Sequence, residues 1–206
     1  MTRKATILLL FSFLLFGITR IEAAETASQI LDRAATKVRQ QKSIVVSYTI
    51  SADGHNQDGT LTLAGDRFTL SSPGLASWYD GKTQWTYSDQ IGEVNVTEPT
   101  PEELQQVNPF AIINSFKKIY AATLLKSPVN EKKIALKANS KHSDIRNVVL
   151  TLDSSTLYPK QIVLTMSNRR TVTIKLNSIR PGGNLPLSFF RFDSKKYPGI
   201  QVIDLR

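Results

Sequence analysis

Hydrophobic and polar side chains alternate through several short runs between Gly59 and Thr97. A period of two sends one set of side chains to a dry face and the other set to water, as in a half-buried β-strand. Segments 64–66, 72–74, 80–82 and 88–90 separate the runs and supply the Gly, Pro and Asp residues that tight reversals need. The pattern predicts an antiparallel meander, which we interpret as one wall of an apolar hollow. The apolar members of the runs are Leu61, Leu63, Phe68, Leu70, Trp85, Tyr87, Val94 and Val96.

The remaining chain predicts few helices and many further strands. Apolar residues at helical spacing predict one helix over 26–41 and a second helical region over 101–125, in which Pro109 is placed to start a new helix. The polar segment 53–59 predicts a connection. Alternation predicts strands over 43–51, 133–138, 146–152, 160–166, 170–176, 189–192 and 201–205. About ten strands indicate a mainly β fold, in which a curved or partly closed antiparallel sheet is accompanied by helices.

The beginning of the chain has the three parts of a secretory signal peptide. Arg3 and Lys4 precede an uncharged apolar run over 5–18, and small residues follow at Ala23 and Ala24. The alternative is a retained membrane anchor, but the run is short for the roughly 20 residues that a spanning helix needs. We therefore expect a cleaved segment 1–23, a single soluble domain over 24–206, and export to the periplasm.

The composition argues against several classes of site. The chain has no cysteine, which excludes disulfides, thiolate metal sites and thiol nucleophiles. His55 and His142 lie in polar segments without an acidic residue at metal-ligand spacing. Motifs of zinc proteases, serine hydrolases and phosphate-binding loops are missing. We expect no cofactor, no metal and no catalytic residue, although a hydrolase whose residues meet only in the fold stays open as an alternative.

The net charge is +9, and the basic residues are scattered along the chain. Because they form no stripe interleaved with aromatic residues, we expect no nucleic-acid partner. A solvated basic surface is the simplest interpretation. Attraction to anionic lipid head groups or to an acidic partner is the alternative.

Four motifs, taken in order, resemble the LolA-type periplasmic lipoprotein carriers. The sequence DGKTQWTY over 80–87 is similar to a DGKTLW-Y hairpin of that family, and the strand over 59–63 with Phe68 is similar to the family's preceding strand and aromatic residue. NPFAII over 108–113 resembles the start of a family helix. FRF followed by PGIQVIDLR, over 190–206, resembles the family's ending. The resemblance extends over nearly all of the chain after the signal segment.

The resemblance implies an unclosed antiparallel half-barrel with helices over its concave apolar face. Proteins of this family hold the acyl chains of outer-membrane lipoproteins in that hollow. They receive a lipoprotein from an inner-membrane ABC-type releasing complex and pass it to an outer-membrane acceptor, without covalent chemistry. We expect a monomeric carrier of this kind, and the alternative is a lipid- or lipoprotein-sensing module of the same fold.

One corner departs from the family pattern. An Arg-Pro pair commonly precedes the family's aromatic residue, and that arginine helps to hold the helical lid. The corresponding segment here reads LAGDR over 63–67, and Arg67 is the candidate to replace the missing arginine.

The expected lipid-binding residues form a wall and a lid. The alternative is that each is an ordinary core residue between sheet and helices, because the two roles have the same sequence pattern. The expected wall residues are Leu61, Leu63, Phe68, Leu70, Trp85 and Val94, and the expected lid residues are Phe110, Ile113 and Phe116.

Overall fold

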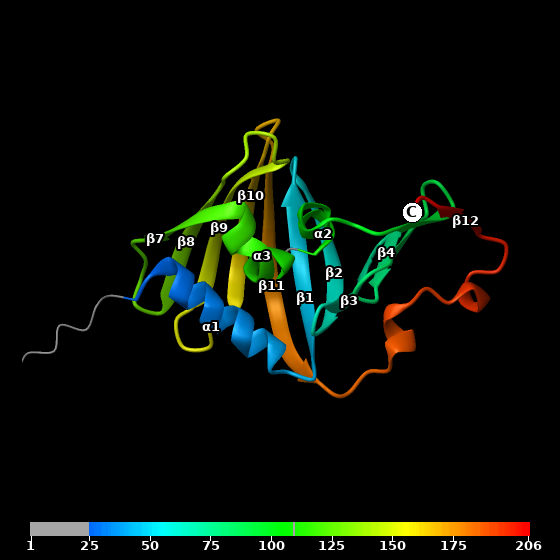
Figure 1. Cartoon of the computed structure of the whole chain (residues 1–206), viewed down its shortest axis with the longest axis horizontal. Coiled ribbons are helices and arrows are strands. Elements are labelled where there is room, and N and C mark those ends of the chain that lie inside the picture. The colour runs from blue at the N-terminus through cyan, green and yellow to red at the C-terminus, as the bar shows by residue number, and fades with distance from the viewer. Residues whose placement is uncertain (1–24, 109) are drawn as a thin grey trace, which may run out of the picture.

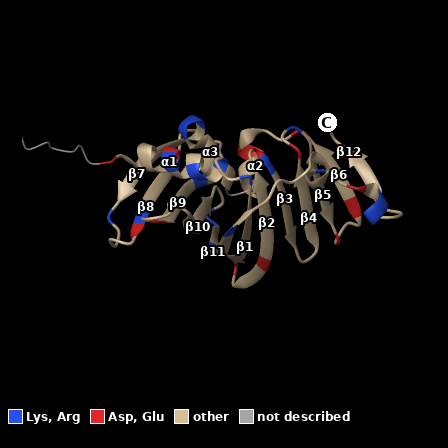
Figure 2. Cartoon of the chain, turned by 90° about the horizontal axis from the view of Figure 1, so that it is seen from below, with Lys and Arg blue, Asp and Glu red and all other residues tan. Residues whose placement is uncertain are grey.

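The computed structural model describes residues 25–108 and 110–206, so the expected signal segment 1–23 and Pro109 lie outside the described residues. One twelve-stranded sheet, in the order β12-β6-β5-β4-β3-β2-β1-β11-β10-β9-β8-β7, dominates the molecule. The sheet is unclosed, and three α-helices lie together on one side of it (Figures 1 and 2). The predicted half-barrel with helices is therefore confirmed.

The strands are β1 (Ser43–Ala52), β2 (His55–Ala64), β3 (Arg67–Ser72), β4 (Leu75–Tyr79), β5 (Gln84–Ser88), β6 (Glu93–Thr97), β7 (Tyr120–Leu125), β8 (Glu131–Ala138), β9 (Ile145–Asp153), β10 (Pro159–Met166), β11 (Thr171–Gly182) and β12 (Gln201–Asp204). The helices are α1 (Ala27–Arg39), α2 (Pro101–Val107) and α3 (Phe110–Ile119), with short 3₁₀ turns η1 (Leu187–Phe190) and η2 (Ser194–Lys196). None of the described helices is long and apolar enough to cross a membrane.

Helix α1 confirms the predicted first helix. The Thr26 hydroxyl accepts a hydrogen bond from the Gln29 backbone N–H at 3.3 Å, and the Gln29 side chain accepts one from the Thr26 N–H at 2.8 Å. This reciprocal capping box satisfies two N–H groups that the first helical turn leaves unpaired. Ile30 and Leu31 are fully buried, so one face of α1 lies against the core.

The predicted helix over 101–125 is correct only in part. Helices α2 and α3 occupy this range as far as Ile119, but the chain becomes strand β7 at Tyr120. β7 pairs antiparallel with β8, with Tyr120 opposite Ala138 and Leu125 opposite Lys133. Pairing with β8 overrides the weak local preference for helix, and a short-range sequence pattern does not reveal such pairing.

The predicted polar connection over 53–59 is wrong, because β2 already begins at His55. Asp53 and Gly54 both have positive φ, 51° and 77°, and make a two-residue hairpin turn whose twist matches the flanking strands. Residues 55–58 are exposed beyond the edge of the core. They therefore lack the alternation of apolar residues by which strands are predicted.

The C-terminal part of the chain also differs from expectation. The predicted strand over 189–192 is instead the turn η1 followed by an irregular stretch, whereas β12 is a strand as predicted. β12 runs parallel to β6 and pairs Gln201 with Glu93. We call residues 183–206 the C-terminal segment. In Figure 1 it leaves the end of β11 and passes beside β3 and β4 to the far edge of the sheet.

Strand register defines the two faces of the sheet, because directly paired residues point to the same side. We call the helix-covered face, which carries Phe68, the inner face, and the opposite face the outer face. The inner face carries the paired row Ile44, Leu63, Phe68, Tyr79 and Gln84. The outer face carries the paired row Thr62, Thr69, Trp78, Trp85 and Val96.

Candidate functional site

Two apolar cavities lie between the inner face and the helices. The first has a volume of about 230 Å³ and is bounded by α1, α2, α3 and the ends of β2, β3 and β4. Apolar side chains from all three helices meet sheet residues there. Its lining includes Val38, Leu63, Phe68, Tyr79, Leu104, Phe110 and Ala111.

The second inner cavity has a volume of about 210 Å³ and lies farther along the sheet. Leu70 follows Phe68 on the inner face of β3, so the two cavities are neighbours along that strand. Strands β1, β10 and β11 supply most of the remaining wall. The lining includes Tyr48, Ile50, Leu70, Gln105, Gln106, Leu164, Met166, Val172 and Ile174.

Helix α2 lies at the boundary of the two cavities, with Leu104 in the first and Gln105 and Gln106 in the second. The Gln105 amide donates to the Ser115 hydroxyl of α3 at 2.9 Å, and Gln105 Oε1 accepts from the Tyr120 hydroxyl at 2.7 Å. Gln106 Nε2 donates to Asp144 Oδ2 at 3.0 Å. A small number of polar contacts therefore holds α2 over the hollow.

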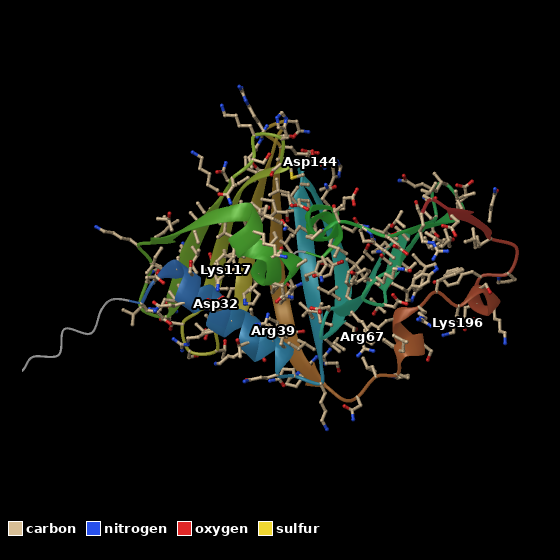
Figure 3. All side chains as sticks on the ribbon, viewed as in Figure 1. Asp32, Arg39, Arg67, Lys117, Asp144 and Lys196 are labelled. Atoms are coloured by element: carbon tan, nitrogen blue, oxygen red, sulfur yellow. The ribbon has the colours of Figure 1, made fainter. Side chains whose placement is uncertain are left out.

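Helices α1 and α3 are joined by polar contacts at the protein surface. Lys117 Nζ lies 2.7 Å from Asp32 Oδ2, and Arg39 Nη1 donates to Asn114 Oδ1 at 3.2 Å. Figure 3 shows Asp32, Lys117 and Arg39 on this helical side. The ion pair is about half exposed, so its contribution to stability is about 1 kcal/mol or less.

Arg67 does not take the place of the missing arginine. It lies on the outer face, where its guanidinium carbon is 5.1 Å from the centre of the Phe190 ring. Arg67, the candidate for that role, therefore lies on the face opposite the helices. Arg67 and Thr69 lie on one face of β3, and Phe68 lies on the other face, towards the helices.

The structure divides the nine expected wall and lid residues into three groups. Four of them line the inner cavities: Leu63, Phe68 and Phe110 the first, and Leu70 the second. Leu61, Ile113 and Phe116 are buried in the core between sheet and helices but line neither of these cavities.

Trp85 and Val94 lie on the outer face, so they do not belong to the same wall. Trp85 pairs with Trp78, and Val94 pairs with Tyr87. Alternation within a run shows that two faces exist, but it does not show which face is shared with the next run. The strand β4, which the pattern did not reveal, and the connections on either side of it determine which residues of β3 and β5 share a face.

Sequence reasoning also missed cavity residues outside the meander. Tyr48 and Ile174 belong to predicted alternating strands, but nothing local indicates that these strands face the same hollow. Tyr79 was missed because the sequence pattern did not reveal strand β4, to which it belongs. Leu104 and Ala111 follow from the helical pattern but not from any signal of a cavity.

The hairpin between β4 and β5, which carries the family-like DGK sequence, is ordered by Asp80. Its Oδ1 accepts from the backbone N–H groups of Lys82 and Thr83 at 3.1 and 3.0 Å, and its Oδ2 accepts from Arg191 Nε at 2.9 Å. Burial alone would raise the pKa of Asp80, but these hydrogen bonds outweigh it and lower the pKa. Asp80 therefore joins the hairpin to the C-terminal segment as a carboxylate.

Tyr48 has an unusual environment at the second cavity. Its side chain lies over Gly59 on the paired strand, where a Cβ atom would collide with the ring. Its hydroxyl is buried without a hydrogen-bond partner among the described residues, and burial raises the pKa of Tyr48 to about 12. This hydroxyl has no partner among the described residues, in a residue that lines the second cavity.

The described residues offer no metal site, since no three His, Asp or Glu side chains among residues 25–108 and 110–206 are grouped to hold an ion. The inner cavities instead combine apolar walls with a few amide and hydroxyl groups. Such a lining suits hydrocarbon chains whose polar ends lie near the helices.

Comparison with known proteins agrees with this geometry. The family model described as Outer membrane lipoprotein carrier protein LolA matches residues 18–168. No curated protein sequence matches the chain.

Three solved structures share the fold. An uncharacterized conserved protein from Thermus thermophilus is 12% identical over 86% of this chain and 98% of its own, with a TM-score of 0.59. A putative outer membrane lipoprotein-sorting protein domain from Vibrio parahaemolyticus is 11% identical over 80% and 95%, with a TM-score of 0.50. A DUF1329 family protein from Desulfovibrio piger is 9% identical over 84% and 98%, with a TM-score of 0.51. At these identities the likeness concerns the fold alone.

Proposed function

Because this chain belongs to the outer membrane lipoprotein carrier protein LolA family, we propose that it carries lipoproteins by enclosing their acyl chains between the inner face and the helices. The observation that supports this most directly is the pair of neighbouring apolar cavities beneath α2. Each buried methylene is worth about 0.8 kcal/mol, so a lipid anchor crosses water only inside such a container.

The closed hollow is small for this task. The two volumes, about 230 and 210 Å³, each fall below the roughly 300–1,000 Å³ of typical ligand pockets. Displacing α2 would remove the boundary between them and join them into one longer hollow. Loading therefore requires α2 to move away from the sheet. Because α2 packs back over the small cavities when no cargo is bound, the closed form would favour release.

The proposed setting follows from the family and the expected signal segment. The protein is exported to the periplasm, residues 1–23 are removed, and the monomer receives its cargo from an inner-membrane ABC-type releasing complex. An outer-membrane acceptor takes the cargo when one is present. Binding and release suffice for this task, so the protein acts as a carrier and not as an enzyme.

The test is to purify the protein from the periplasm of cells that produce it and to identify bound lipoprotein by mass spectrometry. We expect triacylated lipoprotein in the wild type and at least a tenfold loss in Ala111→Phe, because the larger ring fills the first cavity. Ala76→Phe is the matched control, since Ala76 lies on the outer face opposite Tyr87. Far-UV circular dichroism and thermal unfolding establish that both variants are folded.

Two results would contradict the proposal. One is a wild type that never carries lipoprotein, even when it is produced together with one. The other is equal loading of folded Ala111→Phe and wild type. Lipoprotein that binds but is not transferred to acceptor membranes would instead favour the sensing module.

A further inference from the structure

A third cavity lies on the outer face, on the opposite side of the sheet from the two described above. Its volume is about 750 Å³, and it is bounded by β3, β4 and the C-terminal segment. We call it the outer cavity. Its size lies within the roughly 300–1,000 Å³ range of small-molecule sites. Its lining includes Thr69, Ser71, Ala76, Trp78, Pro186, Phe189, Arg191, Phe192, Asp193, Lys196 and Tyr197.

One wall of the outer cavity is aromatic. The Trp78 ring makes edge contacts with Phe192 and Tyr197, at centroid distances of 5.5 and 5.7 Å, and Phe192 lies 5.2 Å from Tyr197. Phe189 adds a ring that is 42% exposed. Aromatic rings provide a broad apolar surface at little cost in side-chain entropy, and they suit a hydrocarbon chain.

Two cationic side chains border the same space. Arg191 uses one edge of its guanidinium to bind Asp80, and its side chain is 53% exposed, so further N–H donors face solvent. Lys196 is exposed and forms no ion pair with any residue in 25–108 or 110–206. The one acidic lining residue, Asp193, accepts a hydrogen bond from the Lys195 backbone N–H.

We propose that the outer cavity binds an anionic amphiphile, in which one apolar chain carries a carboxylate or phosphate head group. The chain lies along Trp78, Phe189 and Phe192, and the head group lies between Arg191 and Lys196. Asp80 already engages one edge of Arg191, so the remaining N–H donors of Arg191 and the exposed Lys196 ammonium are the groups that favour an anionic head group. The sheet lies between this site and the acyl-chain hollow, and Leu70 of β3 borders both spaces.

Both tryptophans of the chain, Trp78 and Trp85, are on the outer face, so intrinsic fluorescence reports this cavity. In the Trp85→Phe background Trp78 is the single reporter. The probes are laurate for the carboxylate arm and dodecyl phosphate for the phosphate arm, both below their micelle concentrations. Dodecanol, dodecyltrimethylammonium and inorganic phosphate separate the contributions of chain and charge.

We expect a saturable change in emission with laurate or dodecyl phosphate, and the stronger of the two identifies the head group. Lys196→Gln should raise the Kd about fivefold, a loss typical of one charge-assisted contact at a partly exposed site. Lys195→Gln, which changes the neighbouring lysine outside the cavity, should leave the Kd unchanged. Ala76→Phe and Ser71→Phe, which fill the cavity from adjacent strands, should each raise it more than tenfold.

Three outcomes would overturn the proposal. They are equal binding of dodecanol, an unchanged Kd in both folded cavity-filling variants, and an absence of any saturable response. Ala111→Phe separates this proposal from the carrier proposal, because it fills the inner hollow and should leave the Trp78 response intact. Failure of lipoprotein loading therefore does not affect the result at the outer cavity.

Discussion

Tyr48, at the second inner cavity, and Tyr120, beside α2, are two buried tyrosines whose hydroxyl groups differ in their partners. The Tyr48 hydroxyl has no partner among the described residues, whereas Tyr120 donates to Gln105 at 2.7 Å. Burial raises the pKa of both to about 12, and the charge of Glu102 adds to the effect at Tyr120. An unfolded tyrosine ionises near pH 10. The folded state therefore favours the neutral form of both side chains.

The pH dependence of the unfolding free energy should report the raised pKa values of both tyrosines. Because the folded pKa is raised, the stabilisation is complete below about pH 10 and is lost as the pH rises towards 12. We expect the unfolding free energy to fall over that window, and Tyr48→Phe and Tyr120→Phe each to weaken the fall. Urea denaturation at several values between pH 8 and pH 11.5 measures it.

Neutral pH distinguishes the two variants. Tyr48→Phe removes an unpaired hydroxyl, so the unfolding free energy should be unchanged or slightly higher. Tyr120→Phe leaves Gln105 Oε1 buried without its donor and should cost about 1–3 kcal/mol. A large destabilisation by Tyr48→Phe at pH 7 would show that its hydroxyl has a partner.

Helix α2 differs from the helices around it in how it is held. Five apolar residues of α1 and five of α3 are buried. Among the α2 side chains that the structure describes, Leu104 is only half-buried, and the buried Gln105 contributes hydrogen bonds instead of apolar area. Few buried apolar contacts mark an element that opens at low free energy. This element is the best candidate for the moving lid, in place of α3, whose Phe110, Ile113 and Phe116 the sequence pattern suggests.

Fixing α2 in place should block loading. The chain has no cysteine, so Gln106→Cys with Asp144→Cys creates one unique pair of thiols. The pair replaces a contact between α2 and the residue directly before β9. Cross-linking this pair with a short bismaleimide should reduce lipoprotein loading at least tenfold, measured by mass spectrometry of the purified complex.

The control is the same double variant treated with N-ethylmaleimide, which modifies both thiols without joining them. It should load more lipoprotein than the cross-linked protein, because α2 stays free to move. Full loading of the cross-linked protein would show that cargo enters without movement of α2.

The sequence predicted those elements whose conformation is determined by nearby residues, and it missed those determined by pairing with other strands. Helix α1 and strands such as β8 and β10 follow from side-chain periodicity and capping, and the sequence predicted them. The strand β7 and the polar half of β2 owe their conformation to neighbouring strands, so local patterns did not reveal them. Leu63 and Phe68 lie on one face of the sheet, whereas the face of Trp85 depends on a register that only the fold supplies.

Over the whole molecule, the sheet separates two spaces of different chemistry. The inner cavities are apolar with amide and hydroxyl groups, and the outer cavity combines aromatic rings with exposed cations. The Asp80 hairpin contacts both sides, since Gly81 borders the first inner cavity and Asp80 binds Arg191. A rigid sheet between them favours independent binding.

We therefore expect the two sites to be filled at the same time. Protein loaded with lipoprotein should bind laurate or dodecyl phosphate with a Kd within about twofold of the empty protein, which corresponds to negligible coupling. Fluorescence titration of both forms measures it, and native mass spectrometry should show one cargo and one probe on the same chain. Competition between the two ligands would mean that they share a space.

The parallel pairing of β12 with β6 has a consequence for the order of folding. Gln201 pairs with Glu93, so this contact closes a loop that contains the five strands β7 to β11, whereas most other strands pair with a neighbour across a short turn. Loop closure over such a distance carries a high entropic cost, which makes the contact slow to form. Until β12 arrives, β6 is an open edge that can pair with other chains. We therefore expect folding to pass through a stage at which the sheet is assembled but its β6 edge is unprotected.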